Sequence, residues 1–209
     1  MLLMKVIALD ADGVLLDYHA AYRMVWEKAF GYLPALRDPL AYWPLDRWDV
    51  RRLQDDELQR FRACLDEDYW SSLPAIQGAV SACERLCEAG YELVCISAIK
   101  PEFQAARLRN LRHRGFPIGN VISAHPSLAA GDSPKVAALR EVNPVAFVDD
   151  YLPYFRGIPS GIHAALVLRQ PHGSPNVGAE VTVLTHSQHD DLAAFVSWWL
   201  DGGRDRRGL

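Results

Sequence analysis

The chain has 209 residues, of which 50% are hydrophobic and 23% are charged. This composition is typical of a globular protein with a packed core and excludes a disordered chain. The formal net charge is −4, and the arginines gather only in the tail GGRDRRGL. We therefore expect no nucleic-acid partner, since no basic surface is available for a phosphate backbone.

The hydrophobic start, MLLMKVIAL, is interrupted by Lys5 and followed at once by acidic residues. It contains no small-residue cleavage site of the kind that ends a signal peptide. No apolar run approaches the ~20 residues that a membrane span needs. We expect a soluble cytoplasmic protein with no membrane partner, whose oligomeric state the sequence leaves open.

The first predicted strand, residues 4–9, ends in the sequence LDADG. Residues two apart in an extended segment point to the same side, so Asp10 and Asp12 both project from the carboxyl end of this strand. Ligands bind at that edge of open parallel sheets, and Gly13 allows a sharp turn there. Taken alone, the motif is equally compatible with a simple turn or a helix cap.

Residues 15–74 are expected to form a small helical domain inserted after the first strand. Tyr18, Tyr22, Trp26 and Phe30 recur every fourth residue and predict one aromatic helix face. A proline-rich loop follows, then a second helical pattern at 55–65. We expect the aromatic face to pack inside the insertion rather than to bind a ligand. Residues 1–14 and 75–209 would then form the other domain.

The rest of the chain alternates between apolar strand patterns and helical patterns. Strands are predicted at 93–98, 145–150 and 163–168, with VTVLT at 181–185 as a further candidate. Helices are predicted at 79–88, 101–114, 134–141 and 189–200. This alternation predicts an α/β fold, a Rossmann-like parallel sheet with helices on both faces.

The four cysteines are expected to be reduced. Cys83 and Cys87 lie one helical turn apart, a spacing open to metal binding, but no second Cys or His pair accompanies them. Free thiols packed in the core of a cytoplasmic protein are the better interpretation.

A second acidic pair, Asp149 and Asp150, directly follows the apolar segment VAFV. Two carboxylate pairs at one sheet edge would repel each other and raise their pKa values unless a cation offset the charge. Mg²⁺ fits this environment, because it binds a few carboxylates and keeps positions for water and phosphate oxygens. The sequence therefore predicts a Mg²⁺ site that includes both acidic pairs.

Lys135 and Ser97 complete the predicted site. In GDSPKVAAL, Ser133 is expected to cap a helix and Lys135 to lie in its first turn, where a cation opposes the helix dipole by ~0.3–1 kcal/mol. Such a lysine is expected to balance negative charge, although a solvated surface lysine is the alternative. Ser97 ends the strand of VCISA, and its hydroxyl and the amide of Ala98 could bind a phosphoryl oxygen; alternatively it caps a turn.

The segments LDADGVLLD, VCISA, SPKVAAL and VAFVDD, in this order, resemble the four motifs of the haloacid dehalogenase superfamily. The insertion resembles the helical cap that this superfamily carries in its first insertion position. The resemblance implies that Asp10 is the nucleophile and that Asp12 protonates the leaving oxygen and then activates water. It implies a Mg²⁺ ion on the Asp10 carboxylate, the Asp12 backbone carbonyl, and Asp149 or Asp150. Ser97, Ala98 and Lys135 would hold the phosphoryl group.

The resemblance implies a phosphatase-type hydrolase that cleaves a small phosphorylated metabolite through an aspartyl-phosphate. A phosphomutase and a catalytically idle phosphate-binding protein are the alternatives. Haloalkanoate dehalogenases and phosphonate-cleaving members of the superfamily lack an acid at the position of Asp12. The acid is present here, and the only cap lysine, Lys28, is expected to face solvent, so the resemblance favours a phosphate monoester over the substrates of both groups. In WPLDRWDVRR, we expect one charged residue among Asp46, Arg47, Arg51 and Arg52 to reach the substrate. Arg47 is the residue that we predict to bind it. The alternative is that these residues form a solvated face.

Overall fold

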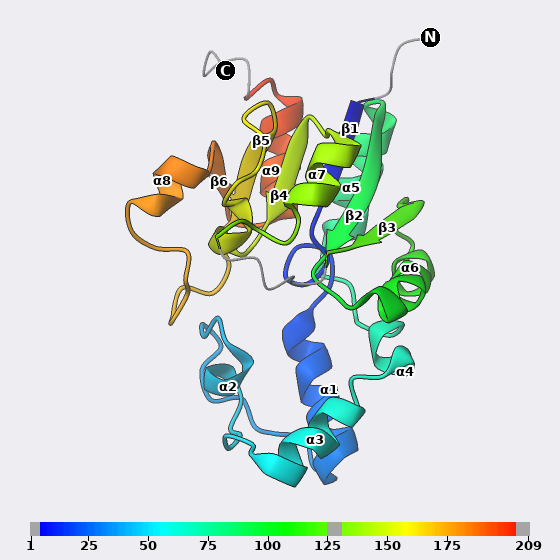
Figure 1. Ribbon diagram of the computed structural model, residues 1–209, viewed down its shortest axis with the longest axis vertical. Helices are drawn as coiled ribbons and strands as arrows, with labels where there is room; N and C mark the ends of the chain where they lie inside the picture. The colour runs from blue at the N-terminus through cyan, green and yellow to red at the C-terminus, as the bar shows by residue number, and fades with distance from the viewer. Residues whose placement is uncertain (1–4, 125–130, 204–209) are drawn as a thin grey trace.

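The computed structural model describes residues 5–124 and 131–203 (Figure 1). Met4, where the first strand was predicted to begin, and the last residues of the arginine-containing tail lie outside these ranges. The described strands form one six-stranded sheet in which all pairings are parallel. They are β1 Lys5–Leu9, β2 Tyr91–Ser97, β3 Asn120–Ser123, β4 Ala146–Asp149, β5 His163–Val167 and β6 Ser187–His189.

The strand order is β3-β2-β1-β4-β5-β6, which is the order of a doubly wound Rossmann-type sheet. The strands β1, β2 and β3 form one half of the sheet and β4, β5 and β6 form the other, and the two halves meet between β1 and β4. At such a switch point the connections on either side lead away from each other, so a crevice opens at the carboxyl ends of the two strands. The predicted α/β, Rossmann-like fold is confirmed.

The helices outside residues 15–74 cover both faces of the sheet, as predicted. They are α5 Ala79–Glu88, α6 Gln104–His113, α7 Val136–Val142, α8 Glu180–Leu184 and α9 Leu192–Leu200, with two 3-10 turns, η1 Pro101–Phe103 and η2 Leu152–Phe155. Successive residues of β1 point to opposite faces: Ile7 and Leu9 pack in the cluster with α5 and α9, and Ala8 packs in the cluster with α7.

The prediction of a strand at 181–185 is wrong, because this segment forms α8. This segment does not form a buried strand: Val183 is 78% exposed, whereas Val181 and Leu184 pack on the core. The edge strand is instead β6, whose short polar sequence SQH pairs with β5. The closing helix starts at Leu192 rather than His189, since the Asp191 carboxylate accepts the Ala194 N–H and caps it there.

Residues 15–74 contain helices and, among the described residues, no strand of the sheet. The helices are α1 Tyr18–Phe30, α2 Pro44–Arg47, α3 Asp55–Ala63 and α4 Glu67–Trp70. They lie beyond the carboxyl ends of the strands (Figure 1). The predicted aromatic face of α1 packs as expected, with Trp26 and Phe30 ring centroids 4.7 Å apart and Tyr22 5.0 Å from Phe61.

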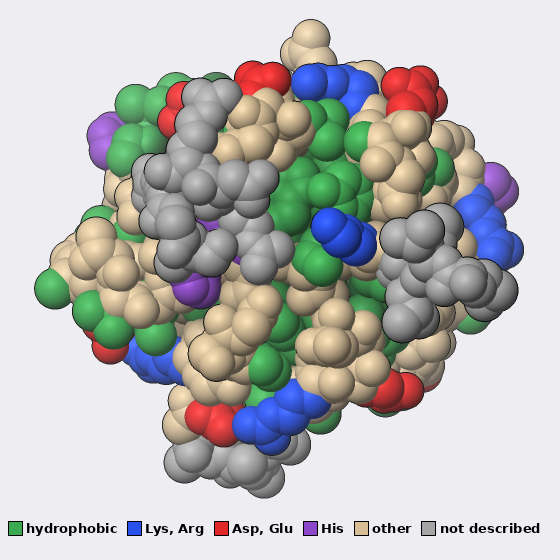
Figure 2. Space-filling model, turned by 90° about the horizontal axis from the view of Figure 1, so that it is seen from above, with side chains coloured by type: hydrophobic (Ala, Val, Ile, Leu, Met, Phe, Trp, Pro, Cys, Tyr) green, Lys and Arg blue, Asp and Glu red, His purple; other side chains and the backbone are tan. Residues whose placement is uncertain are grey.

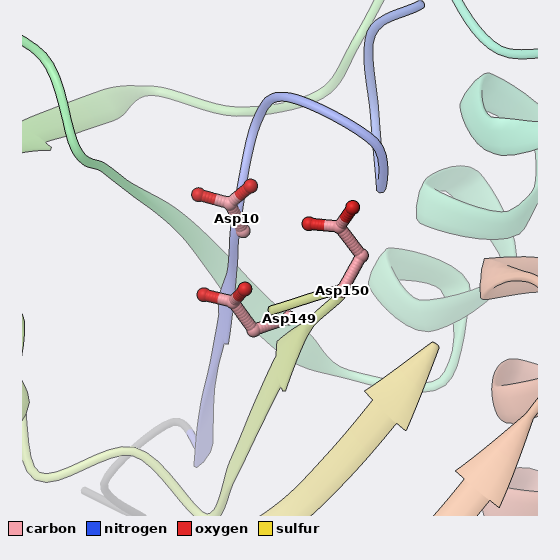
Figure 3. A group of neighbouring side chains, drawn as sticks. All are labelled: Asp10, Asp149 and Asp150. Atoms are coloured by element: carbon pink, nitrogen blue, oxygen red, sulfur yellow. The ribbon is translucent and has the colours of Figure 1, made fainter. Parts of the chain in front are cut away.

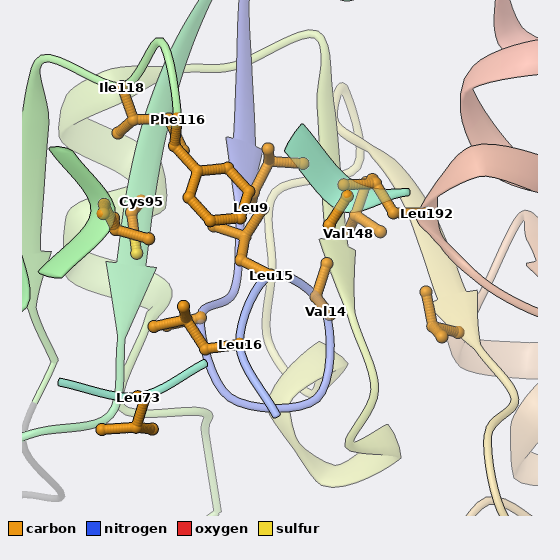
Figure 4. Packing of buried hydrophobic residues seen from close by; sticks show 14 of the residues in the cluster. Leu9, Val14, Leu15, Leu16, Leu73, Cys95, Phe116, Ile118, Val148 and Leu192 are labelled. Carbon is orange, nitrogen blue, oxygen red and sulfur yellow. The ribbon is translucent and has the colours of Figure 1, made fainter. Parts of the chain in front are cut away.

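Two linkers join these helices to the sheet and run side by side. The Asp17 N–H donates to the Pro74 carbonyl and the Ile76 N–H to the Leu15 carbonyl, both at 2.9 Å. The hydrophobic core continues from Leu9 into the linkers through Leu16 and Leu73 (Figure 4). The loop that carries Asp10 and Asp12 is therefore anchored on buried leucines.

The end of the molecule opposite the inserted helices is seen in Figure 2. Basic and acidic side chains are scattered over this face rather than gathered by sign. Within the part of the chain that the structure describes, no helix combines the length and apolar character needed to cross a membrane. The four cysteines are free thiols, and Cys83 and Cys95 are buried.

Candidate active site

Three buried carboxylates meet at the carboxyl ends of β1 and β4 (Figure 3). Asp10 directly follows β1, Asp149 is the last residue of β4, and Asp150 comes next. Each offers an oxygen, and these atoms all lie within 4.8 Å of one another. The parallel pairing of β1 with β4 brings together residues that are nearly 140 positions apart, so three of the four acids that were predicted to gather at this edge lie in one cluster.

Lys135 is fully buried and donates to two of these carboxylates. Its Nζ contacts Asp10 Oδ1 and lies 2.6 Å from Asp149 Oδ2. Burial lowers the pKa of this ammonium, but the two carboxylates outweigh it and raise the pKa above its usual value. Lys135 is at the N-cap of α7, where its own N–H donates to Ser133 Oγ at 3.2 Å. The lysine balances negative charge, as the sequence predicted, and is not a surface residue.

The cluster remains rich in negative charge. Burial raises the pKa of Asp149 well above its usual value; Lys135 opposes this, and repulsion from Asp10 and Asp150 adds to it. Burial also raises the pKa of Asp150. Within the described residues, two cations, Lys135 and Arg169, pair with the three carboxylates of the cluster. Buried carboxylate oxygens with a net negative charge suit a hard divalent cation, so the residues fit a metal site.

Asp150 is surrounded by residues that the sequence analysis did not select. Arg169 Nε donates to Asp150 Oδ2, the Tyr42 hydroxyl lies 3.2 Å from the Asp150 carbonyl, and Asn176 Nδ2 donates to the same carbonyl at 2.7 Å. Gly13 leaves room for this arrangement: a Cβ there would lie 2.6 Å from Arg169 Nε and would collide with the Asp150 carboxylate. Gly13 also has a φ of 95°, which disfavours other residues.

Asp12 lies apart from the acidic cluster. Its carboxylate accepts both of its hydrogen bonds from Arg107 Nη2, at 2.8 Å and 2.9 Å. Burial raises the pKa of Asp12 to about 6, even though the Arg107 charge opposes this shift. The two acids of LDADG therefore stand in different environments, one in the cluster and one on an arginine.

Ser97 and Ala98 lie at the end of β2. Ser97 is 1% exposed, and its Oγ has no hydrogen-bonding partner among the described residues. Ala98 lines the cavity above the site. An orphaned buried hydroxyl beside a cavity is consistent with a role in holding a ligand oxygen.

A cavity of about 380 Å³ opens over Asp10, Asp12 and Asp150. Four aromatic residues of the inserted segment, here named the aromatic wall, line it together with tyrosines that follow β4. The wall consists of Tyr18, Tyr42, Trp43 and Trp70. A second cavity of about 530 Å³ shares Tyr18 and Trp43 with the first and is also lined by Asp46 and Arg52.

The charged residues of WPLDRWDVRR have different positions. Arg47 does not line the cavity over Asp10; it borders another cavity beside His19 and stacks 5.8 Å from the Trp48 ring. Arg51 pairs with Glu57 on the surface. Lys28 is half exposed and lies 2.6 Å from Asp66, in agreement with the expectation that it faces solvent.

Arg107 and Arg169 are the main residues that the sequence analysis missed. Arg169 follows β5 by two residues, at the same sheet edge as Asp149, so the strand-end argument could have selected it. Arg107 lies on α6, whose sequence QAARLRNLRH contains three arginines, and no pattern distinguishes the buried one from the others. Asp17 has a structural role, because its carboxylate caps α1 by accepting the Ala20 N–H at 2.9 Å.

The doubly wound sheet and its strand-end acids define a hydrolase of the haloacid dehalogenase superfamily. The family model described as 5' nucleotidase, deoxy (pyrimidine), cytosolic type C protein matches residues 4–122, more than half of the chain. The chain belongs to this family. No match was found among curated protein sequences.

Solved structures of similar fold include three hydrolases. A family hydrolase of this superfamily from Deinococcus radiodurans, with bound phosphate and sodium, has 17% identity, a TM-score of 0.62 and coverage of 96% of both chains. A dehalogenase has 17% identity, a TM-score of 0.58 and coverage of 96% of this chain and 98% of its own. A predicted phosphoglycolate phosphatase from Haemophilus somnus has 14% identity, a TM-score of 0.56 and coverage of 93% and 97%. At these identities the likeness shows the fold alone.

Proposed function

We propose that the protein is a Mg²⁺-dependent phosphatase that hydrolyses a phosphate monoester through an aspartyl-phosphate on Asp10. The observation that carries this proposal is the convergence of Asp10, Lys135 and Asp149 in one buried cluster beneath a cavity that Asp12 also lines. A nucleophile, a proton donor and a cation are thereby brought to a single position where a phosphoryl group can lie.

The proposed chemistry has two steps. In the first, an Asp10 oxygen bonds to phosphorus, the bond from phosphorus to the leaving oxygen breaks, and Asp12 gives its proton to that oxygen. In the second, Asp12 takes a proton from a water molecule, which attacks phosphorus, breaks the bond to Asp10 and releases inorganic phosphate. Asp12 ends protonated and Asp10 free, ready for the next substrate. The raised pKa of Asp12, about 6, suits a group that must both give and accept a proton.

Other residues of the site would bind the metal ion and the phosphoryl group and neutralise the charge of the phosphoryl oxygens. The Asp10 carboxylate, the Asp12 backbone carbonyl, and Asp149 or Asp150 would hold Mg²⁺. When bound, the ion supplies positive charge for the phosphoryl oxygens. The Ser97 hydroxyl, the Ala98 amide and the Lys135 ammonium would donate to the same oxygens, and the unpartnered Ser97 Oγ supports this assignment.

We further propose that residues 15–74 act as a cap domain over a catalytic domain formed by 1–14 and 75–209. The paired linkers near Leu15 and Pro74 and the aromatic wall support this division. Such a cap would exclude water from the transferring group and select the substrate. We keep cytoplasmic location as a prediction.

The substrate class we propose is a nucleoside 5'-monophosphate, with a pyrimidine deoxyribonucleotide as the first choice. The family description supports it, and an aromatic wall beside the acidic cluster suits a planar base, since bases stack on aromatic side chains. The adjoining cavity lined by Asp46 and Arg52 offers polar partners for base edges. Hydrolysis is preferred to mutase chemistry because the family description is that of a nucleotidase, which releases phosphate to water.

The decisive experiment uses 4-nitrophenyl phosphate with Mg²⁺. The wild-type protein should release phosphate, the reaction should stop when the metal is chelated, and Asp10→Asn should be inactive. Asp17→Asn is the matched control, because it makes the same change at the end of LDADGVLLD and asparagine caps a helix as well as aspartate does. Hydrolysis by Asp10→Asn at the wild-type rate would contradict the nucleophile assignment.

Two further measurements test the finer parts of the proposal. Beryllium fluoride, which mimics an aspartyl-phosphate, should bind at Asp10 only with Mg²⁺ present, and binding without metal would contradict the coordination. A panel of nucleotides, sugar phosphates and phospho-acids should give its highest kcat/KM with a pyrimidine deoxynucleoside 5'-monophosphate. A higher value for a sugar phosphate would exclude the proposed substrate class while leaving the phosphatase chemistry intact.

A further inference from the structure

Helix α6 carries a row of polar residues on the side that faces the site and the linkers. Arg107, Asn110 and Arg114 are spaced three and four residues apart, so they lie along one helix face. Asn110 Nδ2 donates to the Leu73 carbonyl at 2.9 Å, and Arg114 donates to the carbonyls of Leu73 and Ser72. Asn110 and Arg114 therefore hold the linker that returns from the inserted helices to the sheet.

Arg107 has a different partner from the rest of the row. It is fully buried, and its one anionic partner among the described residues is Asp12. Its Nε and Nη1 have no hydrogen-bonding partner in the described part of the chain. Burying a guanidinium with two unmet N–H groups is costly, so an arginine kept only for stability would not be expected here. A functional role of Arg107 at Asp12 would explain why this guanidinium is buried here.

The contact constrains Asp12 in two ways. A single nitrogen lies 2.8 Å and 2.9 Å from the two carboxylate oxygens, which limits rotation of the carboxylate about its terminal torsion. It also draws Asp12 away from the acidic cluster, whose members are Asp10, Asp149 and Asp150. Asp12 lines the cavity, but Arg107 does not, so the arginine acts from behind the carboxylate.

Trp70 connects this pair to the inserted helices. Its ring lies 5.1 Å from the Arg107 guanidinium carbon, and it also lines the cavity. Arg109 on α6 pairs with Glu67 on α4, the helix that ends in Trp70. The guanidinium is thus held between a ring of the insertion and a carboxylate of the catalytic loop.

We propose that Arg107 is a positioning residue that orients the Asp12 carboxylate for proton transfer to the leaving oxygen. This inference rests on the role of Asp12 in the proposed function. Arg107 itself touches no reacting atom. It fixes where the proton donor stands, and the Trp70 ring fixes Arg107.

The test exploits leaving groups that differ in their need for a proton. An alkyl phosphomonoester releases a poor leaving group that must be protonated, whereas 4-nitrophenolate departs without a proton. The value of kcat/KM reports the step in which this group leaves, and ratios of variant to wild type cancel differences in substrate binding.

Arg107→Met should lower kcat/KM by about tenfold to a hundredfold for the best alkyl ester of the panel, since general acid catalysis contributes about 10²–10⁴-fold. It should change the value for 4-nitrophenyl phosphate by less than about threefold, because Asp12 then has no proton to deliver.

Controls separate positioning from folding. Arg114→Met removes an arginine of the same helix row whose hydrogen-bonding partners, among the described residues, are backbone carbonyls, and it should affect both substrates by one factor. In an Asp12→Asn background, Arg107→Met should add little further loss, because the two residues act as one unit. Arg107→Lys keeps the charge and should recover part of the alkyl-ester activity; it also serves if Arg107→Met does not fold.

Three results would overturn the inference. Arg107→Met or Arg107→Lys could lower both substrates equally, its effect could persist undiminished in the Asp12→Asn background, or the wild type could hydrolyse the aryl ester but no alkyl ester at all. Each leaves the Asp10 assignment standing. Retained activity in Asp10→Asn would instead contradict the proposed function itself, so the two failures are distinguishable.

Discussion

The two sides of the cavity are built from different materials. The acidic floor, which consists of Asp10, Asp149, Asp150 and Lys135, comes from strand ends and one helix start of the sheet domain and is almost completely buried. The aromatic wall comes from the inserted helices and their loops, and it is more exposed, with Trp43 at 42%. The floor is held by ion pairs between side chains, whereas the wall is held by ring packing such as the 4.9 Å contact of Tyr42 with Trp43.

Under the proposed function, the floor would carry the chemistry and the wall would select the substrate. Ion pairs in a buried cluster depend strongly on geometry, so changes in the floor should affect every substrate alike. Ring surfaces act through contact area, so changes in the wall should affect each substrate according to what it presents to the rings.

Replacing the floor lysine should have the largest effect. Lys135→Met leaves Asp10 and Asp149 buried without their cation, and removal of one partner of a buried pair costs about 3–5 kcal/mol. Urea unfolding without divalent metal should show this loss of stability, and kcat/KM should fall by one factor for aryl and nucleoside esters. Lys100→Met is the control, because Lys100 is exposed with only a long contact to Glu102, and it should leave both quantities unchanged. Different factors for the two esters would mean that Lys135 also selects substrates.

Gly13→Ala should disturb the floor from beneath. The new Cβ would meet the Asp150 carboxylate and Arg169, and overpacking of this kind costs about 1–3 kcal/mol beyond the roughly 1–2 kcal/mol for a positive φ. Gly31→Ala isolates the second contribution, because Gly31 has a φ of 79° and no atom within 4 Å of the added Cβ. Thermal or urea unfolding measures both variants. Equal destabilisation of Gly13→Ala and Gly31→Ala would show that the side chains of Asp150 and Arg169 move to make room for the methyl group.

Trp43→Ala tests the wall. Loss of base stacking is worth about 1–3 kcal/mol per base, so kcat/KM for a nucleoside monophosphate should fall by about fivefold to 150-fold. The value for glycerol phosphate, which has no ring, should change by less than about twofold. Trp43→Phe retains a ring but loses the Nε1–H bond to the Gly173 carbonyl, and it should retain most of the nucleotide activity. Equal losses for both substrates in Trp43→Ala would remove the distinction between floor and wall.

His19 gives the smallest effect, and it appears only at low pH. His19 lies on α1 next to Tyr18 of the wall, and neither ring nitrogen has a partner among the described residues. Burial lowers its pKa to about 3, with the charges of Arg169 and Arg47 adding to the shift. Below the unfolded value near 6.5 the unfolded chain binds a proton that the folded chain does not, so stability falls as pH falls from about 6.5 toward 3.

This contribution amounts to about 1.4 kcal/mol at pH 5.5. His19→Leu should remove it, so that the loss of stability between pH 7 and pH 5.5 becomes smaller than in the wild type by about 1.2 kcal/mol. At pH 7 the variant should be as stable as the wild type or more stable, because an unpartnered buried polar group is replaced by an apolar one. Urea titrations at the two pH values measure the difference, and an unchanged pH dependence would contradict the assignment.

Much of the floor could be predicted from the sequence. Each floor acid directly follows an apolar strand pattern, and parallel strands place their carboxyl ends at one edge, so local pattern and topology agree. The sheet class follows from the same alternation. The two missed strands, Asn120–Ser123 and Ser187–His189, are short edge strands, and the sequence of the latter is too polar to signal burial.

The aromatic wall and Arg107 could not be predicted from the sequence. The spacing of Tyr18, Tyr22, Trp26 and Phe30 predicted packing, but it could not show that Tyr18, at one end of the row, would also line the cavity. Arg107 became distinguishable from its neighbours on α6 only when tertiary structure brought Asp12 beside it. Burial of a polar side chain depends on a partner that is distant in sequence, and no local pattern encodes that distance.

The central place of β1 has a consequence for how the protein folds. β1 pairs with β2 on one side and with β4 on the other, and β4 begins at Ala146. During synthesis the chain can therefore pair β1 with β2 long before β4 exists. Lys135, which pairs with Asp10, and Asp149, which pairs with the same lysine, are brought to Asp10 by closing a loop of more than 120 residues, which is slow and entropically costly. The acidic floor is thus among the last parts of the molecule to assemble, and an incomplete chain carries Asp10 without the cation that neutralises it.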